Sequence, residues 1–362
     1  MDHEARLSKL RGRFEDVGVH GAVITHRENV AYLCGFDGSA STLVVTADDA
    51  YLFTDSRYEI QASRQVVGAS VEVPPDGIMP GAAKWVNGLK GRPVLCFEGE
   101  RLTVNAVEDL RAKLKRATLV PEERLVEGLR AVKDADELKL IRRAVRMMDR
   151  HYRAVIDAIQ AGATELELAV ELECRVRRDG GRESFSAIVA SGPHSAIPHH
   201  QPTSRRLRRG DLLKIDCGAR VGGYCSDMTR TICVGAPRNA RQGAMYEAVY
   251  AAETAAAAAV RPGATGEELN RIARDAIFAA GFEDGCYRHG LGHGVGREIH
   301  EWPSLGGNAK EPLEVGHVVT IEPGIYVEGF GGVRIEDMVV VTDSGREVLT
   351  RSPKPASLFC VG

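Results

Sequence analysis

The strongest helical pattern in the chain lies just beyond its first third. Apolar residues recur every three or four positions over residues 134–160, which predicts one long amphipathic helix. We expect this helix to end before Gly162, because glycine is common just after the last turn of a helix. Thr164, with Glu167 three residues later, predicts the start of a second helix, since such a pair forms a capping box.

The same order of elements returns about a hundred residues later. Residues 245–260 form an alanine-rich helical pattern that ends at Pro262, and Thr265 with Glu268 opens the next helix. A histidine-containing segment and two strands follow each helix pair. The pattern predicts an internal duplication of a helix-helix-strand-strand unit, with helices covering a curved sheet.

Short apolar runs alternate with helical patterns before residue 126, which is typical of a small α/β domain. We place the end of this domain in the stretch 119–124 and expect domains over 1–126 and 127–362, so that the whole chain is α+β. The expected strands are 21–25, 30–33, 42–46, 51–54, 70–73 and 93–97, and the expected helices are 1–17, 82–89 and 104–114.

A predicted β-hairpin in the second domain carries an aspartate on each arm, Asp216 and Asp227. If its turn is centred between Val221 and Gly222, the two aspartates lie directly opposite each other. Cross-strand partners have Cβ atoms roughly 5 Å apart, so two anions placed in this way repel each other. A cation is therefore expected between them, with a metal as the first interpretation and an arginine as the second.

A second predicted hairpin carries Glu322 and Glu336, which lie opposite each other around a glycine-rich connection centred on Gly329. These acids, like the aspartates, stand in apolar strand-forming runs, where a carboxylate must be paired or bound to metal. Because one divalent ion hardly balances the carboxylates of both hairpins, we expect two metal ions.

Histidines between glycines lie between the two hairpins, at His289, His293 and His300. Imidazole serves as a metal ligand or as a proton shuttle near neutral pH. A phosphate-binding loop is the competing interpretation, but the segment lacks the Lys-Ser/Thr of a P-loop and the βαβ context of a dinucleotide site. The doublet His199–His200 precedes Asp216, and we expect one of the two histidines to face solvent.

Composition excludes several classes of function. The 362 residues are 44% hydrophobic and 27% charged, with a formal net charge of −3, so the chain has no basic footprint for nucleic acid. No apolar run approaches the ~20 residues of a membrane span, and the N-terminus has no signal-peptide core. The eight cysteines form no Cys-x-x-Cys pair. We expect a cytoplasmic protein with reduced thiols.

The two hairpins and the histidine segment resemble the pita-bread metallopeptidases, whose members include aminopeptidase P, prolidase and methionine aminopeptidase. The resemblance covers nearly the whole chain and implies a creatinase-type N-terminal domain before the catalytic domain, as in the proline-specific branch. The family's metal ligands, in order Asp, Asp, His, Glu and Glu, match Asp216, Asp227, His293, Glu322 and Glu336.

The resemblance also implies roles for these residues. Asp227 and Glu336 would bridge two divalent ions, Asp216 would complete one ion, and His293 with Glu322 would complete the other. The remaining histidines of the proline-specific enzymes match His199, His289 and His300, and the family's arginine before the last glutamate matches Arg334.

The implied chemistry is hydrolysis of the bond before proline. Two divalent ions roughly 3.5 Å apart share a water and hold it as hydroxide, which would attack the carbonyl, with Glu322 as general base. His199 and His300 would stabilise the oxyanion or protonate the proline nitrogen, and Arg334 would join them in binding substrate. Oxygen-rich ligands with one imidazole favour Mn²⁺, while Co²⁺, Zn²⁺ or Fe²⁺ also fit.

The choice between aminopeptidase and dipeptidase depends on Ser304. Prolidases have an arginine at this position, after the His-Glu-x-Pro run, that binds the free carboxylate of a dipeptide. Its absence favours an Xaa-Pro aminopeptidase, with the Xaa-Pro dipeptidase as the alternative if Arg297 or Arg334 takes over.

More remote alternatives are a metal-free creatinase-like hydrolase and a non-catalytic partner-binding protein on the same fold. Both should have lost metal ligands that this chain keeps. The expected partners are small peptides with proline at the second position and a second copy of the chain in a homodimer.

Overall fold

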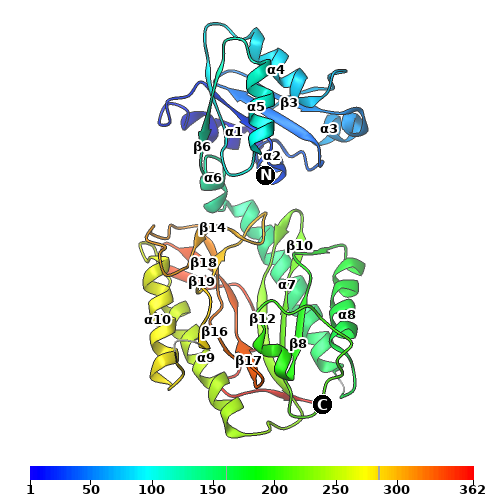
Figure 1. Cartoon of the computed structure of the whole chain (residues 1–362), viewed down its shortest axis with the longest axis vertical. Coiled ribbons are helices and arrows are strands. Elements are labelled where there is room, and N and C mark those ends of the chain that lie inside the picture. Colours follow the sequence, from blue (N-terminus) through cyan, green and yellow to red (C-terminus); the bar gives the residue numbers. More distant parts are fainter. Residues whose placement is uncertain (160, 284–285) are drawn as a thin grey trace. The chain divides into compact units, whose positions relative to one another are not determined.

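The chain folds into two compact units, Met1–Arg130 and Ala131–Gly362 (Figure 1). The computed structural model describes residues 1–159, 161–283 and 286–362. The domain limit proposed from the sequence, between residues 126 and 127, lies a few residues before this division.

The N-terminal unit is built on a six-stranded mixed sheet with the strand order β4-β3-β2-β1-β5-β6. Strands β1, β2 and β3 pair antiparallel, whereas β5 runs parallel to both β1 and β6. Its elements are α1 (His3–Gly12), β1 (Gly21–Ile24), α2 (Arg27–Cys34), β2 (Ser41–Thr46), β3 (Ala50–Thr54), η1 (Ser56–Tyr58), α3 (Glu59–Gln65), β4 (Ser70–Glu72), α4 (Ile78–Gly88), β5 (Val94–Glu98), α5 (Val104–Lys113), β6 (Thr118–Glu122) and α6 (Glu127–Ala131), which reaches the division.

One predicted strand of this unit is wrong. Residues 30–33 lie in helix α2, which ends at Gly35 in the left-handed conformation with φ 84°. All residues of the apolar run are buried, and a short run buried on every side has the same pattern in a helix as in a strand. The other predicted elements are present with shifted ends, and the sequence pattern missed η1, α3, β6 and α6.

The C-terminal unit contains a four-stranded sheet (β20-β12-β9-β8), a five-stranded sheet (β14-β13-β15-β18-β19) and two smaller sheets (β11-β10-β7 and β16-β17). Figure 1 shows its strands between the pair α7 and α8 and the pair α9 and α10. The elements are α7 (Ala135–Asp157), α8 (Glu165–Arg178), β7 (Arg182–Glu183), β8 (Ile188–Ser191), η2 (Gly192–Ala196), β9 (Leu212–Cys217), β10 (Ala219–Val221), β11 (Tyr224–Cys225), β12 (Met228–Val234), α9 (Ala240–Ala259), α10 (Gly266–Ala279), β13 (His293–Gly294), β14 (Glu301–Ser304), β15 (Val318–Ile321), β16 (Gly324–Val327), β17 (Gly331–Arg334), β18 (Asp337–Thr342), β19 (Gly345–Val348) and β20 (Cys360–Val361).

The predicted duplication is confirmed by this order and by the helix starts. Thr164 and Glu167 form the predicted capping box of α8, and the Thr265 side chain accepts from the Glu268 backbone N–H at the start of α10. Helix α9 begins a few residues before the prediction, and the predicted end of α7 at residue 160 lies outside the described residues.

Matching backbone hydrogen bonds hold the two helix starts in place. Gly162 N–H donates to Leu207 O and Leu207 N–H to Ala163 O, at 3.1 and 2.8 Å. The second half repeats the pair with Gly263, Leu313 and Ala264, at 2.8 Å each.

The residue after each cap differs between the halves. Glu165 follows Thr164, whereas Gly266 follows Thr265. A Cβ atom on Gly266 would lie 2.6 Å from the carbonyl oxygen of Ser304, so only glycine fits against that strand.

The predicted register of the first hairpin is wrong by two residues, because the centre of the turn lies one residue later than expected. Asp216 pairs with Thr229, not with Asp227, and the turn is Gly222–Gly223, with φ values of 58° and 86°. A two-residue hairpin turn of this kind needs two residues with positive φ, and Val221 does not suit that conformation. The turn therefore lies on both glycines and moves the register.

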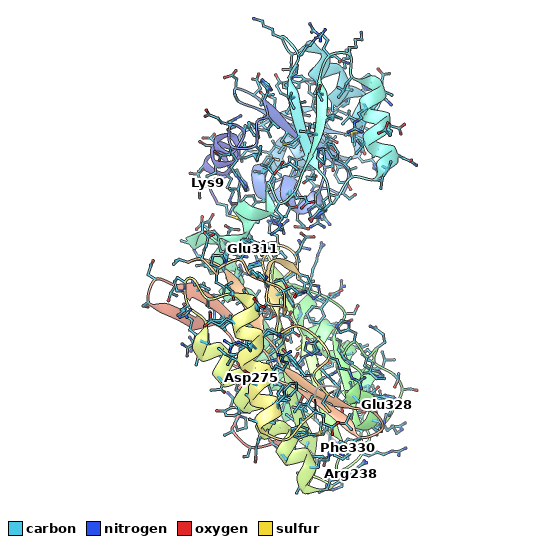
Figure 2. The ribbon with its side chains drawn as sticks, turned by 60° about the vertical axis from the view of Figure 1, so that its left-hand side comes forward. Lys9, Arg238, Asp275, Glu311, Glu328 and Phe330 are labelled. Atoms are coloured by element: carbon cyan, nitrogen blue, oxygen red, sulfur yellow. The ribbon has the colours of Figure 1, made fainter. Side chains whose placement is uncertain are left out.

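The predicted register of the second hairpin is confirmed. Gly324 pairs with Arg334 and Ile321 with Asp337, so the centre is Gly329 and Glu322 faces Glu336 at the junction of two sheets. Figure 2 labels Glu328 and Phe330 in the connection between β16 and β17. The guanidinium of Arg241 from α9 lies 4.9 Å from the centre of the Phe330 ring.

Gly223→Ala is expected to lower the free energy of unfolding by ~1–2 kcal/mol, because an L-residue resists the left-handed conformation. The added Cβ would also lie 3.0 Å from the Arg297 guanidinium. Gly243→Ala is the matched control, since this glycine lies inside α9 with open space around it, and alanine there should raise stability by ~0.5–1 kcal/mol. Urea unfolding measures both, and equal effects would contradict the proposed turn strain.

Candidate metal centre

The site residues proposed from the sequence all line one cavity of about 580 Å³ in the C-terminal unit. The structure brings together the ends of β9, β13, β15 and β17 with the loops that follow β8 and β11. The lining residues are Phe185, Ser186, Ile188, His199, Gln201, Asp216, Asp227, His289, Gly290, Gly292, His293, Ile299, His300, Ser304, Gly306, Glu322, Arg334 and Glu336.

Three of the proposed metal ligands already stand at ligand spacing. One donor atom each of Asp227, His293 and Glu336 lies within 4.8 Å of the others. His293 Nε2 is 3.6 Å from Asp227 Oδ2 and 3.3 Å from Glu322 Oε1. The imidazole therefore faces carboxylates from both hairpins.

The carboxylates of this cluster destabilise one another when charged. Burial raises the pKa of Asp227 well above its usual range, and the nearby Glu336 and Asp216 raise it further. Burial and the charges of Glu322 and Asp216 do the same to Glu336. Oδ1 of Asp216 and Oδ1 of Asp227 are buried and have no hydrogen-bond partner in the described part of the chain. These orphaned acceptors fit a bound cation, and four carboxylates with one imidazole fit a hard divalent ion.

Arg334 supplies part of the missing positive charge. Its Nη2 donates to Asp216 Oδ2, its Nε donates to Thr229 Oγ1 at 3.0 Å, and its Nη1 donates to the Tyr326 hydroxyl at 2.9 Å. Thr229 in turn donates to Glu336 Oε2 at 2.7 Å. One guanidinium cannot neutralise four carboxylates, so the arginine and a metal complement each other.

Glu322 differs from the other acids of the cluster. Burial alone would raise its pKa, but the hydrogen bond and charge of His293, followed by the charge of Arg334, lower it to about 2. Thr320 Oγ1 donates to Glu322 Oε1 at 3.2 Å and accepts the His293 backbone N–H at 3.0 Å. Glu322 is therefore ionised at neutral pH and held next to the imidazole.

A chain of hydrogen bonds fixes the tautomer of His289. Arg334 donates to the oxygen of Tyr326, and the Tyr326 hydroxyl lies 2.9 Å from His289 Nε2. His289 Nδ1 lies 2.8 Å from the carbonyl of Gly290, so its proton is on Nδ1 and Nε2 accepts from Tyr326. Burial, the largest influence, lowers the pKa of His289, in agreement with a neutral ring.

His300 stands edge-on to His293, with ring centres 4.2 Å apart. Burial and the neighbouring His293 lower the pKa of His300. A neutral imidazole at this position can both donate and accept a proton near neutral pH.

One histidine of the doublet faces solvent, as expected, and Arg297 lies outside the described lining of the cavity. Of the doublet, His199 is the exposed residue, while His200 is buried with Nε2 2.9 Å from Glu165 Oε2. His200 therefore has a structural partner that a solvent-facing histidine would lack. Arg297 is buried with its guanidinium over the Tyr224 ring, outside the described lining of the cavity, so it does not replace the arginine missing at Ser304.

Sequence reasoning missed Tyr326, Thr229 and Thr320, which hold the ligands in place. One signal was available for Tyr326. It lies four residues after Glu322 along a strand-forming run, where side chains at even spacing share a face.

Residues 139–343 match the model of metallopeptidase family M24, and residues 6–132 match the creatinase/prolidase N-terminal domain. The chain belongs to metallopeptidase family M24. The pita-bread fold and the N-terminal domain expected from the resemblance are confirmed by these matches and by the solved structures. A peptide-hydrolysing metalloenzyme is therefore established at the level of the family.

Relatives and solved structures match over nearly their whole length. The Xaa-Pro dipeptidase of Pyrococcus furiosus is 35% identical over 352 residues, which cover 96% of this chain and 98% of the relative. The structure of an Xaa-Pro dipeptidase from Bacillus anthracis matches with a TM-score of 0.94 and 36% identity, over 99% of this chain and 100% of that chain. An X-Pro aminopeptidase from Thermotoga maritima matches with a TM-score of 0.90 and 32% identity, over 98% and 99%. Among the described residues, no helix has the length and apolar character needed to cross a membrane.

Asp227→Asn is expected to stabilise the metal-free protein, and by more as the pH rises from about 5 to about 8. The folded-state pKa of Asp227 lies well above its ordinary value of 3.8, so the folded chain holds a proton that the unfolded chain has released. Stability contributed by this group is present below the ordinary pKa and is lost as the pH rises toward the folded one. The amide does not titrate and avoids that loss.

Thermal unfolding of EDTA-treated wild type and variant across this pH range measures the difference. Added Mn²⁺ should raise the midpoint of the wild type and raise that of the variant less, because one ligand is gone. A difference that does not change with pH would contradict the assignment of charge repulsion to Asp227.

Proposed function

We propose that this chain hydrolyses the peptide bond before proline in small peptides with proline at the second position, as an Xaa-Pro dipeptidase. The observation that supports it is the shared cavity in which all five metal-ligand candidates meet His199, His289 and His300. The proline specificity and the dipeptide length come from the relatives, since the Pyrococcus furiosus and Bacillus anthracis proteins are both named Xaa-Pro dipeptidases.

The aminopeptidase favoured by the sequence becomes the second candidate. The relatives support it less well, because the Thermotoga maritima aminopeptidase is the less similar of the two structures. One observation still favours it, namely that the cavity has Ser304 where a dipeptidase of this family would offer an arginine to the substrate carboxylate.

Asp216, Asp227, His293, Glu322 and Glu336 would hold two divalent ions, for which we propose Mn²⁺. When bound, such ions activate water and polarise a carbonyl group. Asp227 and Glu336 have the strongest need for shared positive charge, since burial and neighbouring carboxylates raise the pKa of both. This need supports their inclusion among the residues that would hold the ions.

The remaining residues bind substrate and move protons. Glu322 is ionised and would accept a proton from the attacking water, although its low pKa makes it a weak base until its surroundings change. His300 and His199 would donate to the oxygen of the scissile carbonyl or to the proline nitrogen. Phe185, Ile188 and Ile299 give the cavity an apolar wall that suits a prolyl ring.

Arg334 acts on substrate indirectly in this proposal, since its guanidinium already binds Asp216, Thr229 and Tyr326. The homodimer and the cytoplasmic location expected from the sequence are kept as proposals.

Substrate length is tested with the full-length, Mn²⁺-loaded protein and the pair Ala-Pro and Ala-Pro-Ala. The dipeptidase proposal expects hydrolysis of Ala-Pro and little or none of Ala-Pro-Ala. Faster cleavage of the tripeptide would favour the aminopeptidase instead. If neither peptide is cleaved, nor a panel with other first residues, the peptidase proposal itself fails.

Glu322→Ala should reduce kcat by at least about 100-fold even with excess metal, because it removes both a ligand and the proposed base. Glu328→Ala is the matched control, since Glu328 is an exposed acid at the tip of the same hairpin. Steady-state hydrolysis of the preferred peptide gives both values. Retention of more than about a tenth of the wild-type rate by Glu322→Ala would exclude the proposed role.

A further inference from the structure

The carboxylate of Glu165, outside the metal centre, accepts hydrogen bonds from several residues of the loop that carries His199. Glu165 is the first residue of α8, and its side chain is fully buried. Its Oε1 accepts the backbone N–H of Ser191 at 2.8 Å and the Ser191 hydroxyl at 2.6 Å. Its Oε2 accepts the backbone N–H of Thr203 at 3.2 Å and the Thr203 hydroxyl at 2.7 Å. Glu165 thereby binds both ends of the segment 191–203.

Two histidines from within the same segment also face Glu165. His194 Nδ1 lies 3.0 Å from Oε1, and His200 Nε2 lies 2.9 Å from Oε2. The two rings lie against each other with centres 4.4 Å apart. An ionised carboxylate only accepts, so each imidazole presents an N–H to it.

This arrangement offsets the cost of burying a charge. Burial would raise the pKa of Glu165, but hydrogen bonds from Ser191, His200 and Thr203 outweigh it and lower the pKa to about 2. The carboxylate therefore stays charged, and both of its oxygens are fully used. Glu165, His194 and His200 also have the spacing of a metal site. Because the imidazoles already donate to a saturated carboxylate, no ion is needed to explain the cluster.

Pro198, the residue before His199, is held by two side chains from other strands. Lys214 Nζ from β9 donates to the carbonyls of Ile197 and Pro198 at 2.7 and 3.1 Å, and Arg334 Nη1 donates to Pro198 at 3.4 Å. In the described part of the chain the His199 ring has no hydrogen-bond partner of its own, although it lines the cavity. Its position therefore follows from Pro198 on one side and His200 on the other.

We propose that Glu165 is a positioning residue for catalysis, which holds His199 toward the substrate by fixing Ser191, His194, His200 and Thr203 around one carboxylate. The role rests on the proposed function, in which His199 binds the reacting carbonyl or the proline nitrogen. Glu165 itself lies outside the cavity lining and touches neither metal ligands nor substrate.

Glu165→Gln tests the proposal, because the amide keeps the shape but places an NH₂ group against donors on one side. We expect kcat on the preferred peptide to fall about 10- to 100-fold, since a small misplacement of a catalytic group has effects of this size. KM should stay within about three-fold, and the number of bound Mn²⁺ ions should not change. Glu167→Gln is the matched control, because this exposed acid caps the same helix without touching the loop, and glutamine preserves the cap.

Hydrogen exchange tests whether Glu165 holds the segment 191–203, which we call the clamp, without any activity assay. The amides of Ser191 and Thr203, which donate to Glu165, and the segment between them should exchange at least about 10-fold faster in Glu165→Gln and at the wild-type rate in Glu167→Gln. If exchange is faster in Glu165→Gln but the wild type cleaves no peptide, the role of Glu165 in holding the loop is kept and the proposed function fails. Unchanged exchange, or a wild-type kcat in Glu165→Gln, would overturn the positioning role.

Two further outcomes are informative. Loss of a bound metal equivalent in Glu165→Gln would make the cluster a metal site and overturn the proposal. If that variant fails to fold, Thr203→Val removes a single hydroxyl donor, and exchange in the same segment should still rise about three-fold, with no rise counting against the clamp.

Discussion

Repulsion between buried carboxylates is the constraint on which the C-terminal unit depends. Asp216, Asp227, Glu322 and Glu336 are brought to one cavity by two hairpins, and burial makes their charges expensive. Within the chain, Arg334 pairs with Asp216 and His293 pairs with Glu322. Asp227 and Glu336 receive less compensation, and the remaining imbalance favours a cation at this site.

The scaffold meets this constraint with two copies of one structural unit. Each copy supplies a capped helix pair that covers a sheet and a hairpin that ends at the cavity. The carboxylates sit where strands break between sheets. Asp216 lies at the end of β9, and the other three lie at the junctions β11–β12 (Asp227), β15–β16 (Glu322) and β17–β18 (Glu336). At such junctions a side chain can leave the ladder and point into a shared space, while the paired strands on either side hold its backbone.

The helix starts were predictable from the sequence because they depend on local signals, and the acids and histidines proposed as ligands do share one cavity. The register of the second hairpin was predicted correctly from symmetry about Gly329. The prediction for the first hairpin was wrong because it placed the turn midway between the two aspartates, whereas the turn lies on two adjacent glycines. Helix α2 was missed since a short buried run carries no period. Tyr326 and Glu165 were missed for another reason, namely that their contacts with His289 and His200 join segments far apart in the chain. Peptide length could not be derived from Ser304 alone, and the similarity to named dipeptidases shifted that choice.

The position that follows each helix cap shows how the two copies have taken different tasks. In the first copy, Glu165 reaches out and gathers a loop by charge. In the second, Gly266 has no side chain, so the strand that ends at Ser304 can lie directly against the helix. One copy thus holds the loop that follows β8 through hydrogen bonds to a buried carboxylate, and the other holds β14 through close steric fit. The two segments should accordingly be sensitive to different substitutions, the loop after β8 to those that change charge and β14 to those that add volume.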